Sequence, residues 1–127
     1  MTIAYWCLIA VMVITYTFTG IAKFAKGGYN NHCPREYLHN LSGWPKRAYW
    51  AHINSLEVLP QFIGALIIAH TLGMPQYNID VAAIVFTVLR LLYGIFYMLD
   101  YALTRSYCWL GGMFIIAYLI TGAYFHG

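Results

Sequence analysis

Long apolar stretches separated by short polar breaks dominate this chain. Residues 1–22 carry no charge, and the first apolar stretch ends at Lys23. Three further apolar stretches follow a polar segment, and Gly73, Pro75 and Asp100 mark the breaks between them. A helix needs about 20 residues to cross the hydrocarbon core of a bilayer. The pattern therefore predicts four membrane-spanning helices, over residues 1–23, 46–72, 77–99 and 105–125.

The connections between these helices predict the fold class. The one sizeable loop covers residues 24–45, which contain a Gly-Gly pair at residues 27–28 and Pro34. The other two connections are short, and short connections favour antiparallel neighbours. We therefore predict an all-α integral membrane protein, in which residues 1–127 form a single four-helix antiparallel bundle.

Composition supports the membrane interpretation and excludes some partners. Of the 127 residues, 61% are hydrophobic and 9% are charged, whereas soluble domains carry roughly a quarter charged residues. A net charge of +3 from only seven basic residues argues against a nucleic-acid surface. The three cysteines show no paired spacing, so no disulfide framework is expected. His32, Cys33 and His39 do not complete a four-ligand set, so no metal site is expected.

The distribution of basic residues predicts the orientation. Six of the seven fall on one side of the predicted topology, and they are Lys23, Lys26, Arg35, Lys46, Arg47 and Arg105. The positive-inside rule then makes the loop of residues 24–45 cytoplasmic. Both termini are expected to face away from the cytoplasm.

Polar side chains recur at helical spacing in two of the predicted helices. In residues 46–72 they are Arg47, Asn54, Glu57 and Gln61, and in residues 77–99 they are Arg90, Tyr93 and Tyr97, followed by Asp100. Residues three or four apart share one face of a helix. Such a face packs against protein, because lipid cannot satisfy its hydrogen bonds.

The depths of two charges in these helices match. Glu57 lies ten residues after Arg47, and Arg90 lies ten residues before Asp100, so each sits about 15 Å from the same side. Either charge alone would cost at least ~2.5 kcal/mol in the membrane. We therefore predict a structural ion pair between Glu57 and Arg90.

The remaining polar residues predict a pocket that opens to the cytoplasmic side. They lie progressively nearer that side, and they are Asn54, Tyr93, Tyr97, Arg47 and Arg105. Such a pocket suits a small anionic ligand. His52 points away from this face, so we expect it to make a helix contact.

The stretches AHINSLEVLP and RLLYGIFYMLDYALTRS resemble the MAPEG superfamily of membrane-associated proteins in eicosanoid and glutathione metabolism. The family pattern A-H/Q-x-N-x-x-E-x-x-P is matched by Ala51, His52, Asn54, Glu57 and Pro60. The pattern R-x-x-H/Y-x-x-x-Y is matched by Arg90, Tyr93 and Tyr97, and an Arg-Ser pair before the last helix by Arg105 and Ser106. The resemblance covers essentially the whole chain.

The resemblance implies a homotrimer that binds glutathione between adjacent subunits, near the cytoplasmic side, and a lipophilic second substrate that arrives from the bilayer. In that reading Arg105 is catalytic and stabilises the glutathione thiolate, with Ser106 beside it as a hydrogen-bond donor. The implied glutathione-binding residues are Asn54, Glu57, Tyr93, Tyr97 and Lys23. The chain looks more similar to the bacterial branch of the family than to the eicosanoid enzymes, so we expect it in a bacterial inner membrane.

The sequence departs from the family pattern at two positions. Trp50 stands where well-studied members carry an arginine, and Ile53 stands where prostaglandin-E synthase carries another. Such arginines bind the carboxylates of glutathione, and neither Trp nor Ile replaces a bidentate arginine. The expected substitute is Arg47, which lies one turn nearer the cytoplasm, or its neighbour Lys46. Two functions are therefore weighed. The first is a glutathione-dependent transferase or peroxidase, and the alternative is a non-catalytic protein of this fold that binds lipid or serves as an accessory subunit.

Overall fold

The computed structural model describes residues 1–126 and is entirely helical outside its turns and loops. The helices are α1 (Ile3–Phe24), α2 (Pro34–His39), α3 (Gly43–Thr71), α4 (Gln76–Met98) and α5 (Ala102–His126). All except α2 are long and apolar enough to cross a membrane. The chain is thus an integral multi-pass membrane protein with four candidate spans, and the predicted helix ends agree with the observed ones within three residues.

The short helix α2 lies in the segment that was predicted as a loop. It has only six residues, with Pro34 at its start, where the fixed φ angle of proline suits a first helical turn. A helix this short has too few turns to give an apolar period in the sequence. It was therefore missed.

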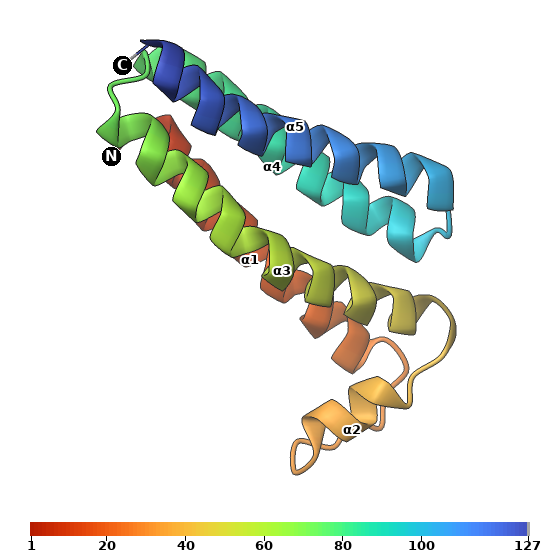
Figure 1. The fold of residues 1–127 in the computed structure, drawn as a ribbon. Coiled ribbons are helices and arrows are strands. Elements are labelled where there is room, and N and C mark those ends of the chain that lie inside the picture. The colour runs from red at the N-terminus through yellow and green to blue at the C-terminus, as the bar shows by residue number, and fades with distance from the viewer. Residues whose placement is uncertain (127) are drawn as a thin grey trace.

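The four long helices form two antiparallel pairs, α1 with α3 and α4 with α5 (Figure 1). The pairs lie close together at the end that carries both termini, and they spread apart toward the end that carries α2 and the α4–α5 connection (Figure 1). Helices α3 and α4 each pack on the other three long helices, whereas, within residues 1–126, α1 and α5 make no contact with one another.

The main apolar core fills the half of the bundle near the termini. Phe62 of α3 and Phe86 of α4 are fully buried, and their rings stack with centroids 4.0 Å apart. Alanines around them, such as Ala65 and Ala83, are also fully buried and let the helix backbones approach closely. The polar residues of α3 and α4 therefore lie in the other half, where the pairs diverge.

Two polar contacts anchor α1. Asp80 of α4 accepts a hydrogen bond from the backbone N–H of Ala4 (2.9 Å), which places a carboxylate at the positive end of the helix dipole. Near the middle of α1, Nδ1 of the buried His52 lies 2.7 Å from the carbonyl oxygen of Thr15. The predicted role of His52 as a helix contact is confirmed.

Candidate functional site

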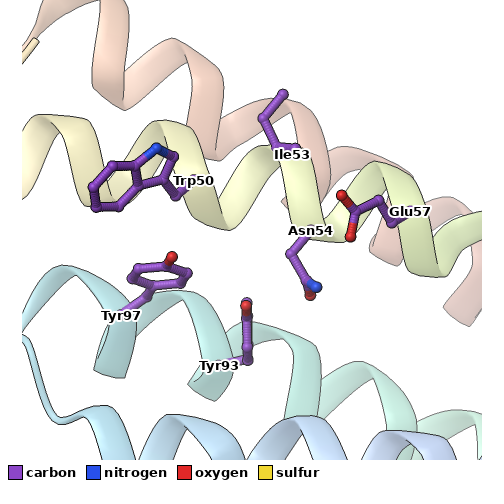
Figure 2. Close-up of a pocket in the computed structure, with 6 residues that line it drawn as sticks. All are labelled: Trp50, Ile53, Asn54, Glu57, Tyr93 and Tyr97. Carbon is purple, nitrogen blue, oxygen red and sulfur yellow. The ribbon is translucent and has the colours of Figure 1, made fainter. Parts of the chain in front are cut away.

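Two adjoining pockets open where the helix pairs diverge. The first has a volume of about 410 Å³ and is lined by Trp50, Ile53, Asn54, Glu57, Tyr93 and Tyr97 (Figure 2). The second has a volume of about 290 Å³ and is lined by Asn54, Tyr93, Tyr97, Arg105, Ser106 and Trp109. Three residues belong to both pockets. The fold thus brings Arg105 and Ser106 of α5 to the polar residues of α3 and α4.

A pair of tyrosine rings on α4 lies between two arginines, one on α4 and one on α5. The guanidinium carbon of Arg90 lies 4.3 Å from the ring centre of Tyr93. Tyr93 meets Tyr97 edge to face, with centroids 5.6 Å apart. The guanidinium carbon of Arg105 lies 4.2 Å from the ring centre of Tyr97. A cation over an aromatic face is attracted to it, so Tyr97 holds the Arg105 guanidinium beside the second pocket.

The predicted ion pair between Glu57 and Arg90 is wrong. Arg90 is only 1% exposed, and its Nη2 donates to Oδ1 of Asn54 (2.9 Å) and to Oγ of Ser55 (3.0 Å). Glu57 is exposed, and in Figure 2 its carboxylate does not reach toward α4. The depth argument compared positions along the helix axes. It could not include the rotation of α3, which turns Asn54 and Ser55 toward Arg90 and leaves Glu57 in the first pocket.

The sequence profile of the MAPEG family matches residues 2–125. The chain belongs to the MAPEG family. Searches of curated proteins and of solved structures found no match. MAPEG proteins include glutathione transferases, glutathione peroxidases and leukotriene synthases, and most of them depend on glutathione.

Arg47 does not replace the arginines that are missing at positions 50 and 53. Its Nε and Nη2 donate to the carbonyl oxygen of Met98, at 3.2 and 3.0 Å, so it caps the C-terminal end of α4. It lines neither pocket. The neighbouring Lys46 donates to the carbonyl oxygens of Leu38 and His39 at the end of α2. The expectation that Arg47 binds ligand in this subunit is therefore corrected.

Lys23 lies in a different cavity from the other predicted site residues. This cavity has a volume of about 390 Å³, lies between α1, α2 and α3, and has Lys23, Arg35 and His52 among its lining residues. No carboxylate lines it. We call it the cationic cavity. Because Ile53 lines both this cavity and the first pocket, the two adjoin at this residue and lie on neighbouring flanks of α3.

Trp50 and Ile53 both line the first pocket, so the departures from the MAPEG pattern fall in the site itself. The Trp50 ring lies 6.3 Å from that of Tyr97. Two further residues of the site were not predicted. Trp109 lies four positions after Arg105, so the two residues share one face of α5. This spacing could have identified Trp109 as a site residue from the sequence. Ser55 gives no sequence signal beyond its place next to Asn54.

Proposed function

We propose that this MAPEG protein is a membrane-embedded, glutathione-dependent transferase or peroxidase. The observation that carries the proposal is the shared pocket in which Arg105 and Ser106 meet Asn54, Tyr93 and Tyr97. Membership of a family whose members mostly depend on glutathione supports it. The pocket also has aromatic walls, among them Trp109, which suit a lipophilic second substrate from the bilayer.

In this proposal Arg105 activates the thiol of glutathione. A thiol is a weak nucleophile and its thiolate a strong one, and a nearby fixed cation lowers the thiol pKa. Arginine suits this role because it stays charged and offers several donors. Its stacking on Tyr97 holds the guanidinium in position before the ligand binds, and such preorganised charge is an effective form of catalysis. Ser106 supplies a further hydrogen-bond donor to the thiolate.

The proposed thiolate then reacts in one of two ways. With an electrophile, sulfur forms a bond to carbon and the leaving group departs with its electron pair. With a hydroperoxide, sulfur attacks the terminal oxygen, the alcohol is released, and a second glutathione converts the resulting sulfenic acid into the disulfide and water. Both reactions begin from the same thiolate, so Arg105 has the same role in each.

We further propose that the protein acts as a homotrimer with a site between subunits. Glu57 is exposed on the isolated subunit although it lies about 15 Å deep in the bilayer. An ionised side chain at that depth needs a polar cover. In a closed ring, one flank of α3 in each subunit can face the other flank in the next. The cationic cavity of a neighbour would then approach the first pocket and provide positive charge for the ligand carboxylates.

Trp50 and Ile53 favour the second candidate, a non-catalytic MAPEG-fold protein that binds lipid or serves as an accessory subunit. The two candidates differ in one measurement, which is calorimetry of glutathione binding to the detergent-purified protein. Micromolar to low-millimolar binding supports the enzyme. An intact assembly without binding would favour the second candidate.

Substituting Glu57 with glutamine should weaken glutathione binding about tenfold, because the acceptor that faces the ligand ammonium loses its negative charge. The thermal midpoint of the ligand-free protein should stay within about 2 °C of wild type, since Glu57 is exposed on the subunit and glutamine keeps the size and the acceptor oxygen of the side chain. Calorimetry and thermal unfolding measure the two effects.

Asp80→Asn is the matched control for that substitution. Asp80 holds the N-terminus of α1, far from both pockets, so its amide variant should lose thermal stability and keep its affinity for glutathione. A Glu57→Gln protein that unfolds well below wild type, with unchanged affinity, would restore a structural role for Glu57.

Two substitutions of Tyr97 distinguish the contribution of its ring to turnover from that of its hydroxyl. Tyr97→Phe keeps the ring under Arg105 and should retain most of kcat. Tyr97→Leu removes the ring, and the loss of a partly buried cation–π contact should lower kcat about tenfold. Steady-state turnover measures both. Tyr107→Leu, at an exposed residue that lines neither pocket, is the control. Equal losses in the Phe and Leu variants would mean that the hydroxyl, and not the ring, matters.

A further inference from the structure

The orientation of the Asn54 side-chain amide is determined by Arg90. A guanidinium has only donors, so the amide atom 2.9 Å from Nη2 must be the acceptor Oδ1. The same nitrogen also donates to Ser55. Turning the amide over would set Nδ2–H against a buried donor and leave Oδ1 without this partner, which costs free energy in a buried site.

This orientation leaves Nδ2 of Asn54 for the pocket. Within residues 1–126, Nδ2 donates to no protein group, and it is not among the buried polar atoms that lack a partner. Asn54 is half-buried and lines both pockets. The pockets therefore meet two N–H donors at this position.

The support behind Asn54 is rigid. Arg90 is 1% exposed and lies on the ring of Tyr93, at 4.3 Å. Its other terminal nitrogen, Nη1, is buried without a protein partner. Of the two terminal nitrogens, only Nη2 therefore links Arg90 to α3, through Asn54 and Ser55. A lysine has one ammonium and cannot reproduce this planar arrangement.

We propose that Arg90 is a positioning residue that holds Asn54 as a donor, so that Asn54 binds an acceptor oxygen of the thiol ligand, a carboxylate or a carbonyl. The ammonium group of the ligand is then left to Glu57, whose carboxylate only accepts. This inference rests on the proposed function, because it assigns two groups of a peptide-like thiol to two neighbouring residues of α3.

Asn54→Asp tests whether Asn54 donates to the ligand or accepts from it, because the two cases change the affinity for glutathione in opposite directions. The carboxylate keeps the size of the side chain and can pair with Arg90, but it presents only acceptors to the pocket. We expect the Kd for glutathione, measured by calorimetry, to rise about 30-fold. If Asn54 instead accepts from the ligand ammonium, the variant would bind glutathione as tightly as wild type or more tightly, and the proposal is overturned.

Ligand-free thermal unfolding tests the contact with Arg90 separately. Asn54→Asp should be at least as stable as wild type, whereas Asn54→Leu, which removes one of the two acceptors of the buried Arg90 Nη2, should be less stable. An Asn54→Asp protein as unstable as Asn54→Leu would overturn the contact. Asn78→Asp, a change of the same type outside both pockets, controls for the added charge. If wild type binds no glutathione, the proposed function fails. The thermal unfolding of the Asn54 variants still tests the contact between Asn54 and Arg90.

Arg90→Lys tests positioning against catalysis. The variant keeps the charge, so we expect an intact assembly, a KM for glutathione about tenfold higher, and a kcat near that of wild type. A lowered kcat with unchanged KM would overturn the positioning role. A lysine variant that matches wild type in both constants would show that the planar guanidinium is not needed.

Discussion

Replacing Arg105 with alanine should lower thiol-dependent turnover by about 10²- to 10³-fold, the range seen when one preorganised donor to a developing charge is removed. The pocket loses its only guanidinium from α5, and the bound thiol then stays largely protonated at neutral pH. Turnover of purified protein with glutathione and a lipophilic electrophile measures the effect. Size-exclusion chromatography checks that the assembly is unchanged.

Arg47→Ala is the control for Arg105→Ala. Arg47 caps the end of α4 through Met98, so this variant should unfold at a lower temperature and keep its turnover within about twofold. Unchanged turnover in Arg105→Ala would remove the proposed mechanism. A large loss of turnover in Arg47→Ala, without loss of stability, would return Arg47 to the site.

Replacing Gly94 with alanine should have the largest effect on the fold. A Cβ atom at this position would lie 1.8 Å from Cζ of Phe18. Phe18 is 2% exposed, so its ring has little room to move, and α1 and α4 must separate. We expect a destabilisation of about 2 kcal/mol, measured by thermal or denaturant unfolding in detergent. Because Gly94 follows Tyr93 in α4, turnover should fall as well.

Two variants make this expectation specific. Gly20→Ala adds the same methyl group to α1 where no atom lies within 4 Å, and it should not destabilise the protein. The double variant Gly94→Ala with Phe18→Ala gives the added methyl group space. Its loss of stability should be smaller than the sum of the losses in the two single variants. A Gly94→Ala protein as stable as wild type would mean that Phe18 is not held against α4.

The four long helices follow from the sequence because the bilayer sets their length. A predominantly apolar stretch of about 20 residues that crosses the bilayer must satisfy its backbone hydrogen bonds internally, and a helix does so. Breaks such as Gly73 and Asp100, both at positive φ, mark where these helices end. Helix α2 is not subject to this constraint, because it lies outside the long apolar stretches, so its six residues gave no comparable signal.

Only part of the candidate site, in its residues and in its contacts, was predictable from the sequence. Helical spacing alone grouped Asn54 with Glu57 and Tyr93 with Tyr97, and all four line the first pocket. Spacing gives the face of one helix. It does not give the rotation of that helix against its neighbour, and the partner of Arg90 was therefore assigned wrongly.

The sequence by itself determined the helical membrane class, the number and extent of the long helices, and the residues of the MAPEG pattern, because these depend on local composition and spacing. Only the tertiary structure decided which polar groups meet. Arg90 contacts Asn54 and Ser55, and Arg47 caps α4. The physical reason is that a hydrogen bond depends on the relative rotation and separation of two helices, which their packed side chains set together.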